Sequence, residues 1–527
     1  MSYSKKYLPL FIGVAMGAGV FLGSKLDFSN PSAKLFSYNA KKEKLNRLID
    51  YIDYEYVDNI NTDSIVDVTV NRILENLDPH SVYIPPEELA GITESMQGDF
   101  IGIGVSYYPY RDTISVINTI KGGPSERSGI KAGDRILMAD NDTLYGDRLR
   151  EEGLANKLKG ELNSQVQLKV YRKGTGVFDV VVKRGKVPLR SVDASYMLSD
   201  SLGLGYIKVN RFAETTYTEF KEALDILQRE GAKKLIIDLR DNGGGFIAPA
   251  LKMADEFLKD DVLMMFTKNK KGAIDENYAT GKGSFEKGEI YVLINENSAS
   301  ASEIFAGAIQ DNDRGTIVGR RSYGKGLVQR EMALGDGSAI RLTISRYYTP
   351  TGRSIQKSYS NGNKEYFNEY LKRYENGELQ NADSIQVADS LKFKTPGGKI
   401  VYGGGGIVPD IFISKDTTRV GETLNYMLRS GRMGGYIFEE LDKKRAFYNE
   451  LTEEQFKTEI EIDDDFADGF LLYVKNAGVD IDLQDYREQL KKYLKAIMAQ
   501  QLFGTDAFEK IINQDDSMIQ KVMSIEK

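Results

Sequence analysis

The spacing of apolar residues changes along this chain, and that change limits the possible folds more than any other feature. Apolar residues have helical spacing in residues 41–57 and alternate as in strands within residues 98–185. Strands then alternate with helices over residues 203–350, and helical spacing returns from about residue 421. A chain of 527 residues is also too long for one hydrophobic core. We therefore predict a multidomain α+β protein.

The changes in spacing divide the chain into five predicted segments. These are a membrane anchor at 1–24, a helical N-terminal region at 41–97, a β-domain at 98–185, an α/β core at 186–415 and an all-α extension at 416–527. Within the core, residues 360–397 are polar and charged, which indicates an insertion or a lid-like excursion. The helix at 41–57 either packs in a core or mediates dimerisation, and we favour a homodimer.

The N-terminus has the features of a signal anchor. Lys5 and Lys6 precede a nearly uncharged stretch of about 17 residues, which is at the lower limit for a membrane span. No A-x-A cleavage site follows, so an uncleaved anchor is favoured over a cleaved signal peptide or a buried core helix. The two lysines place the N-terminus inside. We expect anchoring in the inner membrane, with the rest of the chain on the periplasmic side.

Several chemistries are excluded by composition. There is no Cys, which removes disulfides, thiolate nucleophiles and Cys-ligated metals, and the single His80 excludes a zinc site of several histidines. The net charge is −7, so the chain lacks the excess of basic residues that is typical of nucleic-acid-binding proteins. We predict no metal and no cofactor. Residues 77–81 are typical of a turn, so we interpret His80 as capping or bridging that turn, and a covalent hydrolase here would use Lys as its base.

The β-domain contains the run SERSGIKAGDRILMADNDT. Two predicted strands precede this run, and Gly102 and Gly104 lie in the first of them. This run resembles a PDZ domain in the circularly permuted form of bacterial proteases. Glycines let backbone N–H groups point into a groove, where they can hold a terminal carboxylate while the peptide adds as a strand. The resemblance implies that such a tail binds at Gly102, Ile103, Gly104 and Val105. The alternative is a small β-domain without a ligand.

A serine-rich segment, SASASEIFAGA, begins at Ser298 where a predicted strand meets a helix. A hydroxyl at such a turn is exposed, and the backbone N–H groups that follow lie at the positive end of the helix. This is a suitable place to stabilise an oxyanion. The alternative is structural, because Ser300 and Glu303 have the spacing of a capping box, so that Ser300 only caps the helix.

A lysine-containing segment, GRRSYGKGLVQ, begins at Gly319 and comes close to a phosphate-binding loop. A phosphate-binding loop has a metal-binding hydroxyl at the position of Gly326 and a helix after it. Here the hydroxyl is missing, and the following residues fit a strand as well as a helix, so the phosphate-binding interpretation loses its mechanism. On an extended chain Lys325, Leu327 and Gln329 share one face. Lys325 and Gln329 can therefore both meet a neighbouring serine, with Gln329 orienting the amine.

A third segment, LIIDLRDNGGG, is a buried strand that runs into Gly243, Gly244 and Gly245. Backbone N–H groups without neighbouring side chains can donate to an oxyanion. The alternative is an ordinary turn between a strand and a helix.

Together, and in this order, these segments resemble the C-terminal processing (tail-specific) serine peptidases. The resemblance covers roughly residues 41–355, and the 25-residue gap from Ser300 to Lys325 fits it. It implies a crotonase/ClpP-like core in which Ser300 is the nucleophile, Lys325 the general base and Gln329 the residue that positions Lys325. The choice of Ser300 over the neighbouring Ser298 and Ser302 rests on the spacing of the family.

The resemblance also implies an oxyanion hole and a function. The hole would consist of the N–H groups of Gly244 and Ala301, with Gly245 as the alternative to Gly244. The chain would be a serine endopeptidase that captures protein or peptide substrates by their free C-termini and cleaves near them. The alternatives are a catalytically inert PDZ scaffold that binds tails, and a crotonase-like enzyme acting on acyl thioesters.

The proposed mechanism requires an unusual lysine. A free Lys titrates near ~10.4, so a base that works near neutrality needs a pKa about three units lower, which corresponds to about 4 kcal/mol. Burial away from carboxylates has this effect. The residues around Lys325 in the sequence, from Tyr323 to Val328, carry no acid. We predict that Lys325 is neutral when substrate is bound.

Overall fold

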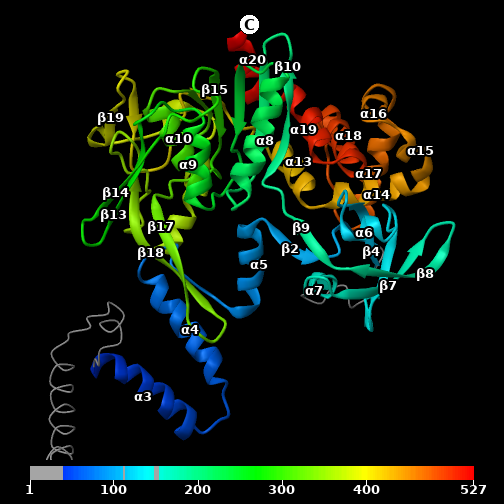
Figure 1. Cartoon of the computed structure of the whole chain (residues 1–527), viewed down its shortest axis with the longest axis horizontal. Helices are drawn as coiled ribbons and strands as arrows, with labels where there is room; N and C mark the ends of the chain where they lie inside the picture. Colours follow the sequence, from blue (N-terminus) through cyan, green and yellow to red (C-terminus); the bar gives the residue numbers. More distant parts are fainter. Residues whose placement is uncertain (1–39, 111–112, 147–153) are drawn as a thin grey trace, which may run out of the picture. The chain divides into compact units, whose positions relative to one another are not determined.

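The computed structural model describes residues 40–110, 113–146 and 154–527 (Figure 1). The predicted anchor at 1–24 lies outside these residues. None of the helices that are described is both long enough and apolar enough to cross a bilayer. The chain divides into two compact units, with the boundary between residues 73 and 74. The first unit contains α3 (Ala40–Glu55) and most of α4 (Thr62–Glu75). The predicted helix at 41–57 is confirmed as α3.

The predicted β-domain is a mainly antiparallel sheet with its own core. The sheet has the order β3 (Val105–Tyr110), β4 (Thr113–Thr119), β5 (Arg135–Ala139), β7 (Gln165–Arg172) and β8 (Gly176–Lys183), and β6 (Asp142–Thr143) pairs with β5. The short helices are α6 (Pro124–Arg127) and α7 (Leu154–Leu158), and β2 (Asp99–Gly102) pairs with β9 (Gly185–Pro188). Alternate residues of β7 are buried, because one face of the sheet covers the core.

The α/β core is built on a six-stranded sheet. Its order is β10 (Val192–Ser199), β11 (Leu204–Val209), β12 (Lys234–Asp238), β15 (Glu289–Ile294), β16 (Thr316–Gly319) and β21 (Ile411–Phe412). Only β10 is antiparallel to its neighbour. The sequence predicted three of these strands, β11, β12 and β15, but not the shorter or outer ones.

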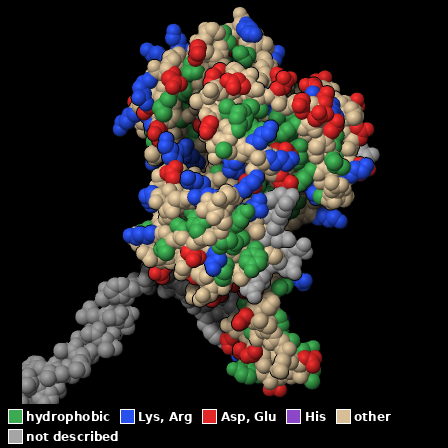
Figure 2. All heavy atoms as spheres, turned by 90° about the vertical axis from the view of Figure 1, so that its right-hand side faces the viewer, with side chains coloured by type: hydrophobic (Ala, Val, Ile, Leu, Met, Phe, Trp, Pro, Cys, Tyr) green, Lys and Arg blue, Asp and Glu red, His purple; other side chains and the backbone are tan. Residues whose placement is uncertain are grey.

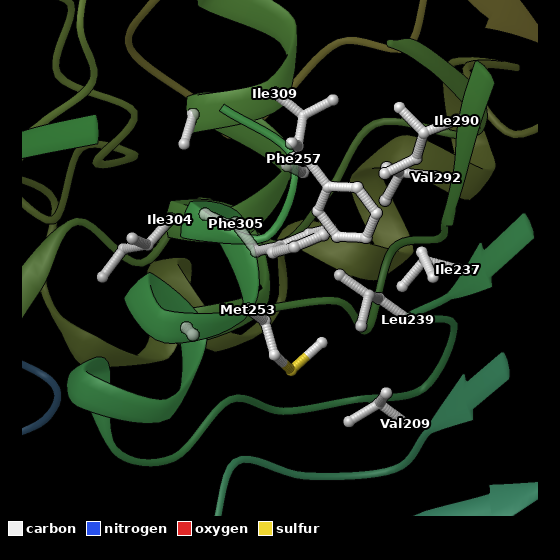
Figure 3. Packing of buried hydrophobic residues seen from close by; sticks show 14 of the residues in the cluster. Val209, Ile237, Leu239, Met253, Phe257, Ile290, Val292, Ile304, Phe305 and Ile309 are labelled. Atoms are coloured by element: carbon white, nitrogen blue, oxygen red, sulfur yellow. The ribbon is translucent and has the colours of Figure 1, made fainter. Parts of the chain in front are cut away.

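Three helices pack against one face of this sheet. They are α8 (Thr216–Arg229), α9 (Ile247–Asp255) and α10 (Ala301–Asp311), and the sequence predicted the first and the last. Figure 3 shows the aromatic centre of this core, where Phe257 and Phe305 lie together with 6.0 Å between their ring centroids. The central strands are apolar at almost every position because both faces of the sheet are covered.

The C-terminus of the chain covers the other face. Met518, Ile519 and Val522 of α20 (Ser517–Glu526) belong to one buried cluster with residues of the sheet. An ion pair of 2.6 Å between Arg240 and Asp516 holds the start of this helix. The predicted all-α extension is therefore not separate throughout, because its last helix completes the core of the preceding region.

The rest of the extension forms a helical bundle with its own core. Its helices are α13 (Arg419–Arg429), α14 (Arg432–Lys443), α15 (Arg445–Glu450), α16 (Glu453–Glu459), α17 (Asp464–Asn476), α18 (Arg487–Phe503) and α19 (Thr505–Ile512). Acidic and basic side chains are interspersed on the face of the molecule shown in Figure 2.

A second sheet lies beside the core and is antiparallel. It consists of β1 (Val82–Ile84), β18 (Ala339–Tyr348), β13 (Leu263–Asn269) and β14 (Ile274–Tyr278), with β17 (Leu327–Ala333) paired to β18. Helix α5 (Pro86–Gln97), which the sequence analysis did not predict, follows β1.

The predicted insertion at 360–397 is folded. It contains α11 (Asn363–Phe367), α12 (Glu369–Glu375), η3 (Ala382–Ser384), η4 (Asp389–Leu391) and β19 (Lys392–Lys394), which pairs with β20 (Ile400–Tyr402). Tyr366, Arg373 and Leu379 are buried. The polar composition had suggested an excursion, but these three side chains are enclosed by the rest of the protein.

Candidate active site

A cavity of about 630 Å³ brings the predicted catalytic residues together. Ser300, Lys325 and Gln329 all line it, as does the glycine run Gly243–Gly245. No residue of the described insertion 360–397 lines the cavity, so the insertion does not cover it as a lid in this structure. The predicted tail-binding residues lie elsewhere, where β2 leads into β3.

The structure distinguishes the three serines of the SASAS segment. Ser298 is fully buried and donates from Oγ to the Leu239 carbonyl at 2.8 Å, and Ser302 is fully buried and donates to the Asn242 carbonyl at 2.9 Å. Ser300 lines the cavity. Two of the hydroxyls therefore hold the turn together, and the third lies where a substrate can reach it.

Ser300 also has an unusual backbone conformation. It is the N-cap of α10 with φ 56° and ψ −113°, a region that residues other than glycine seldom adopt. The Tyr347 hydroxyl donates to its carbonyl oxygen at 3.2 Å. Such a conformation persists only where its surroundings enforce it, and it is found most often at functional sites.

A buried carboxylate joins the serine segment to the lysine segment. Glu303 is fully buried, and its Oε2 accepts the N–H groups of Ser300 and Lys325, both at 2.9 Å. Its Oε1 accepts the Gly324 N–H at 2.7 Å and the Ser322 hydroxyl at 2.5 Å. The predicted capping box is present, and the same side chain also fixes the backbone of both predicted catalytic residues.

Lys325 lies in surroundings that disfavour its charge. Burial and the positive charge of Arg341 lower its pKa, while Glu303 and Asp78 act in the opposite direction. Its Nζ donates to Gln329 Oε1 at 3.0 Å. In the described part of the chain, no hydrogen bond joins Nζ to the Ser300 hydroxyl, so the amine is held by Gln329 in the same cavity as the serine.

The chain after Lys325 excludes a phosphate-binding loop. β17 begins at Leu327 and pairs with β18, so the loop leads into a strand and not into a helix. The phosphate-binding mechanism needs that helix and a hydroxyl after the lysine.

The turn that contains His80 holds Gln329. The Gln329 side-chain amide donates to the His80 carbonyl, and His80 Nε2 lies 2.7 Å from the Tyr366 hydroxyl. The buried Asp78 accepts the N–H groups of His80 and Ser81, both at 2.9 Å. Burial and the nearby Lys325 lower the pKa of His80 to about 3, so the ring is neutral. His80 therefore belongs to a turn, as predicted, and this turn also orients the partner of Lys325.

The glycine run lies directly against Ser300. A Cβ atom on Gly244 would lie 2.7 Å from Ser300 Cβ and 3.0 Å from the Ala301 nitrogen, so only glycine fits. The Gly244 N–H donates to Asn242 Oδ1 at 2.9 Å. Among the described residues, the N–H groups of Gly245 and Ala301 donate to no protein acceptor. Unlike the Gly244 N–H, these two groups would not have to leave a protein acceptor in order to donate to an oxyanion.

One side of the cavity is apolar. Ile92 and Met96 of α5 lie there with Phe246, Ile247 and Leu327. Such a surface removes water from the neighbourhood of Ser300 and suits an uncharged side chain of a polypeptide. The sequence analysis missed this wall because it did not predict α5.

The predicted tail-binding segment leads into an edge strand of its sheet. Gly104 has φ 72°, and β3 is the first strand of its sheet, so one of its edges is not paired within that sheet. An extended peptide can add to such an edge.

Sequence analysis also missed three polar residues of the site. Glu303 was considered only for its capping-box spacing, and Asp78 and Asn242 were not considered. One signal was available for Glu303, since an acidic residue inside an otherwise apolar helix needs a partner when it is buried. No local signal could have identified the distant partner of Asp78, which is the hydroxyl of Thr343 on β18.

Comparison with known families gives matches over three parts of the chain. Residues 203–362 match peptidase family S41, and residues 101–178 match the PDZ domain. Residues 423–504, in the helical bundle, match a family of unknown function.

The chain is similar to several curated proteins over most of its length. It is 30% identical over 359 residues to the carboxy-terminal processing protease CtpA of Bacillus subtilis, which covers 67% of this chain and 76% of that protein. It is 32% identical over 346 residues to a probable CtpA-like serine protease of Staphylococcus aureus, covering 65% and 67% of the two chains. The solved photosystem II D1 C-terminal processing protease is 25% identical, with a TM-score of 0.37 and coverage of 71% and 86%.

Proposed function

Because the chain belongs to the carboxy-terminal processing proteases of peptidase family S41 and is a serine peptidase, we propose that Ser300 is its nucleophile and Lys325 its general base. The observation that carries this proposal is the single cavity that Ser300 and Lys325 share with the glycine run. The lowered pKa of Lys325 supports it, since an uncharged amine can accept a proton.

The proposed reaction proceeds through an acyl-enzyme. Lys325 Nζ leaves Gln329, takes the proton from Ser300 Oγ, and the oxygen attacks the carbonyl carbon of the scissile bond. The N–H groups of Ala301 and Gly245 donate to the oxyanion, with Gly244 as the alternative if its bond to Asn242 opens. The protonated amine gives its proton to the leaving nitrogen. Water, activated by the same amine, then releases the acyl group and restores the serine.

We propose that the PDZ domain recruits the substrate by its free C-terminus. Backbone N–H groups at Gly102, Ile103, Gly104 and Val105 would hold the carboxylate while the tail pairs with β3. The match of residues 101–178 to the PDZ domain and the unpaired edge of β3 support this role.

The test compares wild type with Ser300→Ala and Lys325→Arg on peptides that differ only in a free or amidated C-terminus. We expect cleavage of the free peptide by wild type alone, and weaker binding of the amidated one. A serine-directed acylating probe should label Ser300. Full activity of Lys325→Arg would contradict the role of the amine, and equal cleavage of both peptides would contradict tail recognition. An inert scaffold is not favoured, because residues 203–362 match a peptidase family.

We further propose that residues 1–24 anchor the protein in the inner membrane, with the peptidase on the periplasmic side. The lysine pair before an apolar stretch supports this orientation. Fractionation followed by external protease treatment tests it, and a full-length protein found only in the soluble fraction would contradict it.

A homodimer formed through the N-terminal region is a separate proposal. Leu48, Tyr51 and Tyr54 of α3 are 53%, 65% and 81% exposed, which is unusual for large apolar side chains on one helix. Sedimentation of wild type against Leu48→Glu tests it, and a monomeric wild type would contradict it.

A further inference from the structure

A single arginine of the insertion holds the loop that leads to Lys325. Arg373 lies on α12, and only 3% of its surface is exposed. Its Nη1 donates to the carbonyl oxygens of Arg321 at 3.1 Å and Ser322 at 2.8 Å, and its Nη2 donates to that of Tyr323 at 3.3 Å. Three consecutive carbonyl groups therefore point to one guanidinium, two residues before Lys325.

The other side of the same loop is held by a negative charge. Glu303 accepts the N–H groups of Gly324 and Lys325. The loop is thus fixed through its carbonyl groups by a cation and through its amide groups by an anion. Hydrogen bonds to ionised groups are about twice as strong as those between neutral ones, so this arrangement restricts the loop more than turn residues alone would.

The insertion reaches the side chain of Lys325 by a second route. The Tyr366 hydroxyl of α11 lies 2.7 Å from His80 Nε2. The carbonyl of His80 accepts the Gln329 amide, and Gln329 accepts the Lys325 amine. The position of the amine therefore depends on the insertion through its backbone and through its hydrogen-bond partner.

The charges under the loop are expensive to bury. Arg373 lies 3.2 Å from Glu369, which also pairs with Lys357 at 2.7 Å, and Arg321 pairs with Glu378 at 2.6 Å. Apolar residues of the same volume usually give equal or greater stability than a buried ion pair. A role in stability alone does not explain why polar groups are present here, whereas fixing a loop geometry does.

We propose that the insertion 360–397 positions the general base, with Arg373 setting the loop and Tyr366 setting Gln329 through His80. This inference rests on the proposed function of Ser300 and Lys325. Arg373 and Tyr366 are positioning residues, because neither lines the cavity. Their loss should slow acylation of Ser300 and leave capture of the substrate tail unchanged, since the proposed tail site is in a different domain.

The first test replaces Arg373 by Met and compares it with Lys372→Met. Lys372 is the preceding residue on α12, and its side chain is 52% exposed and paired only with Glu365 at the surface. We expect kcat of Arg373→Met to fall about 30- to 100-fold, because a displacement of about 1 Å costs up to ~10² in rate. KM and the affinity for a free-tail peptide should stay within about twofold. Lys372→Met should match wild type.

The second test removes one oxygen atom and keeps the aromatic ring in place. Tyr366→Phe loses only the hydroxyl at His80, and Tyr370→Phe loses a hydroxyl of α12 that accepts from Lys415 Nζ at 2.7 Å instead of contacting His80. We expect kcat to fall about 5- to 10-fold in the first and to stay unchanged in the second, with equal melting temperatures.

Two results would overturn the proposal. One is wild-type kcat in folded Arg373→Met and Tyr366→Phe. The other is a parallel loss of kcat, tail affinity and melting temperature in both, which would indicate a general structural role. The serine-directed probe separates failure of the present proposal from failure of the proposed function. Ser300 of the wild type stays unlabelled if the proposed function fails, whereas it is labelled if only the present proposal fails.

Discussion

Lys325, which is half-buried, and Lys357, which is buried, are two lysines close to Gly324, and the regions around them differ. The amine of Lys325 lies in the cavity beside the neutral Gln329 and near the positive Arg341. The amine of Lys357 lies under the insertion, 2.7 Å from Glu369 and 3.8 Å and 4.2 Å from the ring centroids of Tyr323 and Tyr366.

The comparison shows that burial alone does not make a base. Burial lowers the pKa of both lysines, but Glu369 opposes this effect at Lys357, and aromatic faces favour a cation there as well. At Lys325 the largest effect from a charged neighbour, that of Arg341, acts in the same direction as burial. Among the described residues, no carboxylate forms an ion pair with the Lys325 amine, whereas Glu369 pairs with that of Lys357, and this difference suits Lys325 to accept a proton.

The largest expected effect is a difference in kcat between the variants that lack Lys325 and Lys357. Lys325→Met should lower kcat by about 10³-fold or more, because general-base catalysis contributes about 10²–10⁴. Lys357→Met removes a cation that does not face the cavity, and we expect about a tenfold loss at most. Peptide hydrolysis by the two purified variants checks this, with melting temperatures as the control for folding. Equal losses in kcat would remove the distinction.

The next prediction gives Lys325 the kind of neighbour that Lys357 has. Gln329→Glu places a carboxylate at the amine and stabilises its protonated form, which raises the pKa of Lys325. We expect about a 10²-fold loss of kcat/KM near neutral pH that diminishes as the pH rises. The pH profiles of wild type and variant measure it, with Gln329→Met as the uncharged control. A loss that does not depend on pH would argue against this explanation.

A smaller effect is expected from Arg341. Arg341→Gln removes a positive charge that disfavours the lysine cation, so the pKa of Lys325 should rise. The acidic limb of the kcat/KM profile should then move to higher pH, with little change in the plateau. Arg346→Gln on the same strand serves as a control, because Arg346 donates to Tyr359 and does not line the cavity. If the acidic limb of the kcat/KM profile of Arg341→Gln lies at the same pH as that of wild type, burial alone sets the pKa of Lys325.

The smallest effect concerns stability at acid pH. His80 has a pKa of about 3 in the folded protein, below the ordinary value of 6.5, so its contribution to stability is present above pH 6.5 and is lost as the pH falls toward 3. His80→Gln should therefore show a shallower fall of melting temperature between pH 6.5 and 4 than wild type. Parallel curves would mean that the ring is protonated as easily in the folded chain as in the unfolded one.

Much of this architecture follows from local sequence. The strands and helices around Leu235, Val292 and Ala301 were predicted because their apolar spacing and buried runs are strong local signals. The serine, lysine and glycine segments were also identified in the sequence, since each places a polar or glycine residue where a strand or helix ends. Weakly periodic elements such as α5 and β16 were missed, because short runs of apolar residues fit several structures equally well.

Other features depend on contacts between distant segments. The sequence predicted that Lys325 has no acid beside it in the chain, but Glu303, Asp78 and Arg341 meet it only after folding. Likewise, Ser300 differs from its buried neighbours Ser298 and Ser302 only after folding, because their hydroxyls then donate to carbonyl groups of the loop that follows β12. Residue types and spacings thus determined which groups can do the chemistry, while the tertiary structure decided their burial, partners and charge, because these are set by residues far apart in the sequence.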